Sequence, residues 1–134
     1  MRSDPTGCSG KTILLVDDEP AVLALIKQLL EHNGYTVIFA DTCAQALQYA
    51  ERDKESIDLL VTDVAMPGMN GIELSERVKS IIPGLKVLYT SGYTAGILMK
   101  DNTLMEGVNF IQKPFSRRAL CSAVFDLLQP REDL

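Results

Sequence analysis

The chain has 134 residues, of which 46% are hydrophobic and 23% are charged, a composition typical of one globular domain with its own core. Its net charge is −5 at pH 7, and the scattered lysines and arginines give no basic patch for nucleic acid. No apolar run in the sequence is long enough to span a membrane, and the first ten residues do not form a hydrophobic signal segment. Three cysteines without a CxxC pair and a single histidine argue against a zinc cluster and favour a reducing, cytoplasmic location.

The composition divides the chain into three parts. Residues 1–10 are polar and rich in Gly and Pro, which predicts a flexible tail or a linker from a longer protein. Residues 11–129 are predicted to form one domain, and residues 130–134 a short C-terminal tail.

The first half of the domain is predicted to alternate strands and helices. A strand over residues 11–16 precedes a helix that opens at Pro20 and ends near Asn33-Gly34. A second strand covers residues 35–40, and Asp41 or Thr42 is expected to cap a second helix. The apolar residues expected to face the core are Val22, Leu25, Ile26, Leu29 and Leu30 in the first helix and Ala46, Leu47 and Ala50 in the second.

The second half continues the alternation. A buried strand begins at Ile57, reaches Asp63 and is followed by a turn at Pro67-Gly68. The later elements are a helix over residues 72–82, a strand over 85–90, a weaker helix over 95–107, a strand over 108–112 and a helix that Ser116 caps and that runs to residue 128. The last helix is expected to face inward through Leu120, Val124, Leu127 and Leu128. Five strands and five helices in strict alternation predict a doubly wound α/β fold with a parallel five-stranded sheet between two helical layers.

Polar residues follow four of the predicted strands. Asp17 and Asp18 follow the first strand, Asp63 ends the third, Ser91 follows the fourth and Lys113 follows the fifth. The carboxyl ends of the strands are where open α/β sheets bind ligands. Three carboxylates brought together repel one another unless a hard cation such as Mg²⁺ is present. A lysine and a hydroxyl beside them suit a carboxylate nucleophile, Asp63, that attacks a phosphoryl group.

Four motifs carry a resemblance to a known family. They are Asp17-Asp18-Glu19-Pro20, the run from Asp63 to Gly71 (DVAMPGMNG), Thr90-Ser91-Gly92-Tyr93 and Lys113-Pro114-Phe115. Over residues 11–129 the chain resembles the response regulator receiver family, whose members have a flavodoxin-like fold. The separations of 28 residues from Asp63 to Ser91 and 22 from Ser91 to Lys113 are typical of that family.

The resemblance implies a phosphoacceptor site. Asp63 would take a phosphoryl group from the phosphohistidine of a histidine kinase or a histidine phosphotransfer domain. Asp18, Asp63 and the backbone carbonyl of Ala65 would bind Mg²⁺, or Mn²⁺, and Asp17 would act through a water molecule. Lys113 would contact the phosphoryl group.

The resemblance also implies a conformational switch. Ser91 would be the switch hydroxyl, because its spacing to Lys113 fits better than that of Thr90. Phe110 would be the switch aromatic residue and would move inward on phosphorylation, without a hydroxyl to offer a partner. Gly71 would serve the turn after the acidic loop. Pro114 would follow Lys113 in a cis peptide bond.

The amino-acid sequences around the last two motifs resemble those of receivers at the C-terminus of hybrid sensor histidine kinases. The chain is therefore expected to be a domain of such a kinase, and the alternative is a stand-alone regulator. Beyond its own phosphorylation and dephosphorylation the domain is not expected to be an enzyme. It is expected to contact neither nucleic acid nor membrane, and dimerisation through the face of the fourth and fifth strands is an option that the family allows. Because Ala65 departs from the larger or polar residue common at its position, the lifetime of the phosphoryl group is not predicted.

Three other functions compete with this one. An aspartyl-nucleophile phosphatase would carry Asp-x-Asp after its first strand, where this chain has Asp17-Asp18-Glu19. A pseudo-receiver that binds partners independently of phosphate would be expected to lack an acidic residue or the lysine, and here none is missing. A nucleotide-binding flavodoxin-like protein would need a glycine-rich phosphate loop after the first strand, which the sequence lacks.

Overall fold

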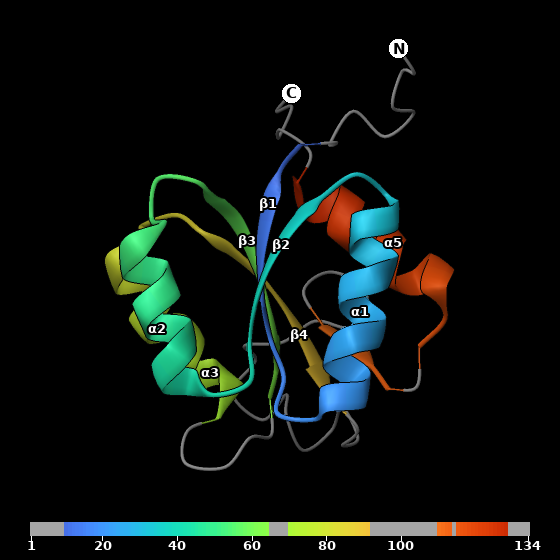
Figure 1. The fold of residues 1–134 in the computed structure, drawn as a ribbon, viewed down its shortest axis with the longest axis horizontal. Helices are drawn as coiled ribbons and strands as arrows, with labels where there is room; N and C mark the ends of the chain where they lie inside the picture. The colour runs from blue at the N-terminus through green and yellow to red at the C-terminus, as the bar shows by residue number, and fades with distance from the viewer. Residues whose placement is uncertain (1–9, 65–69, 92–109, 114, 129–134) are drawn as a thin grey trace.

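The computed structural model describes residues 10–64, 70–91, 110–113 and 115–128. Five parallel strands form one sheet in the order β2-β1-β3-β4-β5 (Figure 1), which confirms the predicted doubly wound α/β fold. The strands are β1 (Thr12–Val16), β2 (Thr36–Ala40), β3 (Ile57–Asp63), β4 (Lys86–Ser91) and β5 (Phe110–Gln112). The helices in the described residues are α1 (Pro20–His32), α2 (Cys43–Arg52), α3 (Gly71–Ile81) and α5 (Arg117–Leu128).

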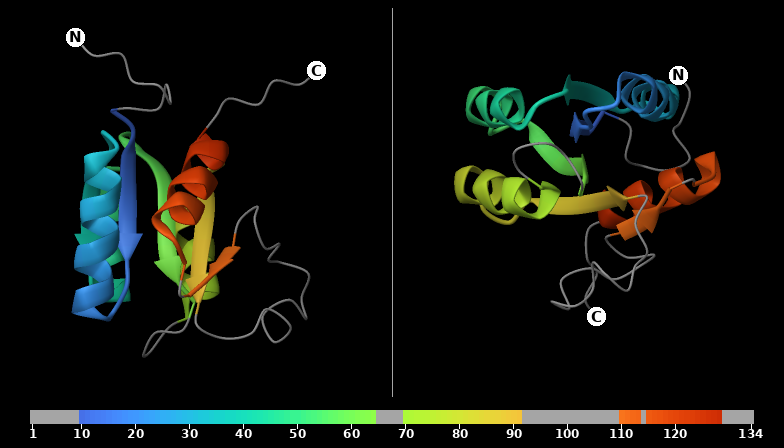
Figure 2. Two further views of the ribbon diagram at one scale, coloured as in Figure 1. Left: turned by 90° about the vertical axis from the view of Figure 1, so that its right-hand side faces the viewer. Right: turned by 90° about the horizontal axis from the view of Figure 1, so that it is seen from below.

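Helices cover both faces of the sheet. Helices α1 and α5 pack on one face and α2 and α3 on the other, as the view along the strands makes plain (Figure 2). The central strands β1 and β3 are covered on both faces. This burial explains why their sequences are nearly continuous runs of Val, Leu and Ile. No helix among the described residues is both long and apolar enough to cross a membrane.

Local signals in the sequence account for most helix boundaries. Helix α1 begins at Pro20, whose fixed φ suits the first turn, and is followed by Gly34 at φ +95°. Thr42 rather than Asp41 caps α2, because its side chain accepts a hydrogen bond from the backbone N–H of Gln45. Ser116 caps α5 as predicted. Strand β3 has the predicted bounds, and β1, β2 and β4 differ from the predicted ones by one residue at their ends. The predicted start of the last strand, residues 108–109, and the helix predicted over residues 95–107 lie outside the described residues.

The prediction for the inward face of α1 is wrong at one position. Leu25 is 52% exposed, whereas Leu23, which the apolar pattern passed over, is buried with Ile26 and Leu30. Each residue turns an α-helix by about 100°, so Leu25 lies about 200° around the axis from Leu23 and points away from the sheet. The exposed leucine becomes part of the surface beside the acidic site.

The polar groups singled out in the sequence collect at one edge of the sheet. Asp63 ends β3 and pairs in register with Thr90 of β4, while the Val64 N–H donates to the Thr90 carbonyl over 2.9 Å. Lys113 follows β5 directly. Parallel strands bring their carboxyl ends to the same edge, and the site forms there.

Candidate functional site

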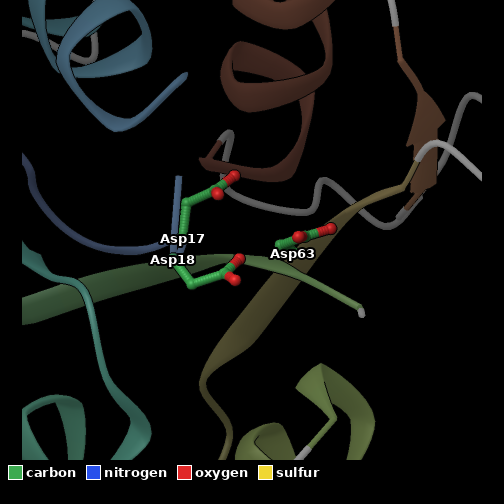
Figure 3. A group of neighbouring side chains, drawn as sticks. All are labelled: Asp17, Asp18 and Asp63. Carbon is green, nitrogen blue, oxygen red and sulfur yellow. The ribbon is translucent and has the colours of Figure 1, made fainter. Parts of the chain in front are cut away.

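Three carboxylates form the centre of the site. Asp17 and Asp18 follow β1 and Asp63 ends the neighbouring strand β3 (Figure 3). Carboxylate oxygens from all three lie within 4.8 Å of one another. Asp17 and Asp63 are buried, at 1% and 6% exposure, and Asp18 is half-buried. A cluster of oxygen donors with this spacing can hold a metal ion of the hard divalent class.

Lys113 provides the positive charge at this centre. Its Nζ lies 3.1 Å from Asp17 Oδ2, 3.6 Å from Asp63 Oδ1 and 3.8 Å from Glu19 Oε1. Burial acts to lower the pKa of Lys113, but the hydrogen bond to Asp17 and the nearby negative charges outweigh it and raise the pKa above its ordinary value of 10.5. The ammonium group is therefore held in its charged form among the acids.

Asp17 is fixed through both of its oxygens. Oδ1 accepts a hydrogen bond from the Glu19 backbone N–H over 2.9 Å, and Oδ2 accepts one from Lys113. These two hydrogen bonds favour an indirect role for Asp17 in metal binding, because a metal ion bound to either oxygen would compete with one of them. Glu19 was not singled out as a site residue, and the only signal for it was its place in the acidic run that follows β1.

Gly71 lies against the backbone of Asp63. It is the first residue of α3, and its N–H donates to the Val64 carbonyl over 2.7 Å. A Cβ added at Gly71 would lie 2.2 Å from the Asp63 carbonyl oxygen and 3.0 Å from the Val64 Cα. Glycine is needed here for a close approach between two backbone segments, and the role in the turn that the resemblance implies stays an expectation, because residues 65–69 lie outside the described residues. Asn70 caps the same helix by accepting a hydrogen bond from the Glu73 N–H.

Phe110 already points inward. Its side chain is fully buried in the cluster that lies under α2 and α3, and its strand position pairs with Tyr89. The movement expected on phosphorylation would start from an outward side chain, and Phe110 does not point outward in this structure. The structure represents only the inward arrangement of this residue.

Some of the predicted site residues cannot be placed. Ala65 and Pro114 lie outside the described residues, so the carbonyl ligand and the cis peptide bond remain expectations. Ser91 is the last residue of β4, where its backbone pairs with Gln112, and its side chain is not described. Its competitor Thr90 is buried.

Comparison with known proteins identifies the family. The family model "Response regulator receiver domain" matches residues 13–125. The chain belongs to the response regulator receiver family. It is 35% identical over 118 residues to the response regulator receiver protein CpdR of Brucella abortus (strain 2308), a match that covers 88% of this chain and 97% of that protein. Receiver domains belong to two-component systems, and this function is the one that the residues had indicated.

Further relatives are a hybrid kinase and solved receiver structures. The sensor kinase CckA of the same Brucella strain is 33% identical over 128 residues, which span 95% of this receiver and 14% of the kinase. The crystal structure of the receiver domain from the hybrid histidine kinase CckA superposes with a TM-score of 0.75 at 35% identity, over 88% of this chain and 99% of that one. A CheY-like receiver from Methanospirillum hungatei JF-1 gives a TM-score of 0.77 at 33% identity, over 90% and 94%. These matches agree with the predicted fold and family and do not favour the phosphatase or pseudo-receiver alternatives.

Proposed function

We propose that Asp63 is the phosphoacceptor of this receiver and that it takes its phosphoryl group from a phosphohistidine on a histidine kinase or a histidine phosphotransfer domain. The observation that carries the proposal is the position of the Asp63 carboxylate. It lies at the carboxyl edge of the sheet, 3.6 Å from the Lys113 ammonium and beside two further carboxylates. Lys113 would neutralise the charge of the incoming group while Asp63 attacks it.

The same cluster fits Mg²⁺. Asp18 and Asp63 are the ligands proposed from the described residues, with Asp17 acting through water because Lys113 and the Glu19 N–H occupy its two oxygens. The carbonyl of Ala65 is the third proposed protein ligand. When bound, the cation would neutralise negative charge on the phosphoryl oxygens. Carboxylate oxygens together with water are the donor set that Mg²⁺ prefers, and Mn²⁺ accepts the same donors.

The transfer itself is a displacement at phosphorus. A carboxylate oxygen of Asp63 forms the new P–O bond as the P–N bond of the donor breaks, and the electron pair returns to the imidazole nitrogen. Lys113 holds its charge against the phosphoryl oxygens throughout and transfers no proton. The result is an acyl phosphate on Asp63 and a free histidine on the donor.

Ser91 and Phe110 would report the new charge. Ser91 ends β4 next to the acidic edge, and we infer that its hydroxyl contacts the phosphoryl group of the modified Asp63. Phe110 lies in the adjacent strand and would be held inward in that state. The surface formed by β4 and β5 would then change shape and bind different proteins, and dimerisation through this surface is one outcome.

The donor protein would dock beside Lys113. Val22, Leu25 and Phe115 line an apolar pocket of about 380 Å³ together with Lys113. The exposed Leu25 side chain is well placed to meet an apolar surface of the partner that carries the phosphohistidine. Leu25→Glu should therefore slow transfer from a phosphorylated phosphotransfer domain and leave labelling by acetyl phosphate unchanged.

The domain would act in the cytoplasm, because three widely spaced cysteines without a CxxC pair favour a reducing compartment. It would catalyse only its own phosphorylation and dephosphorylation. The similarity to the receiver of a hybrid kinase supports a place in such a protein.

Intact mass after incubation with acetyl phosphate tests the proposal. The native chain should gain one phosphoryl group in the presence of Mg²⁺ and none in EDTA, and Asp63→Asn should gain none. Asp58→Asn, a matched change in the same strand, should be labelled like the native chain. A native chain that binds Mg²⁺ without gaining mass, or Asp63→Asn that gains as much as the native chain, would refute the assignment.

A further inference from the structure

A pair of buried hydroxyl groups joins α3 to β4. Ser75 and Tyr89 are 1% and 4% exposed, and Ser75 Oγ lies 2.7 Å from the Tyr89 hydroxyl oxygen. Ser75 Oγ also donates to the Ile72 carbonyl over 2.8 Å. A serine hydroxyl carries one proton, so Tyr89 must be the donor to Ser75. The bonds therefore run in one direction, from Tyr89 to Ser75 to the carbonyl in the first turn of α3.

Both ends of this chain of bonds meet the backbone of the phosphoacceptor. At one end, Ile72 follows Gly71, where an added Cβ would lie 2.2 Å from the Asp63 carbonyl oxygen and whose N–H donates to the Val64 carbonyl. Helix α3 thus touches the phosphoacceptor backbone through its first residue.

The other end reaches the same backbone through β4. Tyr89 precedes Thr90, which pairs with Asp63 in register and accepts the Val64 N–H. The hydroxyl pair closes a ring of contacts that holds Asp63 and Val64 between α3 and β4.

We propose that Tyr89 and Ser75 are a pair of positioning residues that set how α3 and β4 hold the Asp63 backbone and so determine how fast Asp63 accepts a phosphoryl group. This inference rests on the proposed function of Asp63. Each hydroxyl acts through the segments that contact the Asp63 and Val64 backbone, namely the first turn of α3 and the end of β4. Small displacements of a reacting group reduce rates strongly, so loss of the bond is felt at Asp63.

The test compares isosteric variants at this pair with a matched tyrosine elsewhere. Tyr89→Phe keeps the ring and removes the donor, and Ser75→Ala removes the acceptor. Tyr35→Phe makes the same chemical change at an equally buried tyrosine that packs in the cluster under α1 and α5, on the opposite face of the sheet. Initial rates of phosphorylation are measured against acetyl phosphate concentration with Mg²⁺ present, and are corrected for the folded fraction from urea denaturation.

Loss of the bond should lower the maximal rate about three- to tenfold in Tyr89→Phe and in Ser75→Ala. The concentration of acetyl phosphate for half-maximal rate and the affinity for Mg²⁺ should stay unchanged. The double variant should be no slower than the slower single variant, because both remove the same bond. Tyr35→Phe should have the native rate.

Suppose that the native chain is phosphorylated and that Tyr89→Phe and Ser75→Ala are less stable but react at the native rate per folded molecule. This result overturns the inference about the hydroxyl pair and leaves the proposed function of Asp63 intact. Equal slowing by Tyr35→Phe also overturns the inference, since the effect would then follow from any loss of stability. A native chain that takes up no phosphoryl group overturns the proposed function of Asp63, and this inference with it.

Discussion

Replacing Gly71 with alanine tests the contact between α3 and the phosphoacceptor. The new Cβ would lie 2.2 Å from the Asp63 carbonyl oxygen, and ordinary van der Waals contact begins at 3.4 Å, so the two segments must separate by about 1.2 Å (3.4 − 2.2). Overpacking of this kind costs about 1–3 kcal/mol, and a clash with backbone atoms belongs at the upper end. Alanine recovers less than about 1 kcal/mol through its better helix propensity. We expect a net loss of about 2 kcal/mol in the free energy of unfolding.

The same displacement should reach the chemistry, because the atoms that must move belong to Asp63. A shift of about 1 Å in a reacting group can reduce a rate by roughly a hundredfold, so phosphorylation of Gly71→Ala by acetyl phosphate should be at least tenfold slower per folded molecule. Urea denaturation followed by circular dichroism measures the first effect. Intact mass against time measures the second.

Gly84 supplies a control in which the stability changes for another reason. It has φ +83° and no atom lies within 4 Å of an added Cβ, so Gly84→Ala suffers only the strain of a left-handed residue, about 1–2 kcal/mol. Its phosphorylation rate should be native. If Gly71→Ala is as stable as the native chain, or if it is labelled as fast as Gly84→Ala, the close contact described at Asp63 is wrong.

Three further changes give separate tests. Asp58→Ala removes the carboxylate that accepts a hydrogen bond from the Thr12 N–H over 2.8 Å; urea denaturation should show a loss of about 1–2 kcal/mol with native labelling of Asp63, and an unchanged midpoint would count against the bond. Mg²⁺ should raise the melting temperature of the native chain relative to EDTA, and Asp18→Asn should lose most of this increase; an equal increase in both would remove Asp18 from the ligand set. Burial raises the pKa of the Tyr89 phenol above its ordinary value of 10.0, although its hydrogen bond acts to lower it. The stability that this group contributes is therefore complete below about pH 10 and is lost as the pH rises through the folded pKa, so Tyr89→Phe should lose stability less steeply above pH 10 than the native chain in urea titrations, and parallel curves would contradict this.

The fold could be predicted because its main signals are local. Strands buried on both faces require apolar runs. The signals at the starts of α1 and α5 are also local, because Pro20 acts through its own fixed φ and Ser116 accepts a hydrogen bond from the Ala119 N–H. The inward face of α1 could be predicted less well, because apolar residues cover a wider part of the helix surface than the sheet can bury. Leu25 lies among them and only the packing of the helix shows that it faces outward.

The site could be predicted as a set but not in its detail. The rule that ligands bind at the carboxyl ends of parallel strands brought Asp17, Asp18, Asp63 and Lys113 to one edge. It does not say which acid the lysine prefers, since the order of distances depends on side-chain conformations. The bond between Ser75 and Tyr89 carried no signal, because the two residues belong to different elements and both count as ordinary members of a helix and a strand.

The acidic cluster and its lysine are anchored unequally. Asp17, Asp18 and Asp63 follow or end β1 and β3, which are paired on both sides, whereas Lys113 follows β5, an edge strand of three residues paired only with β4. Edges with few partners open at a lower free energy than central strands. Amide protons of residues 110–112 should exchange before those of residues 13–16, so brief opening of the edge would leave the three carboxylates assembled without their ammonium group.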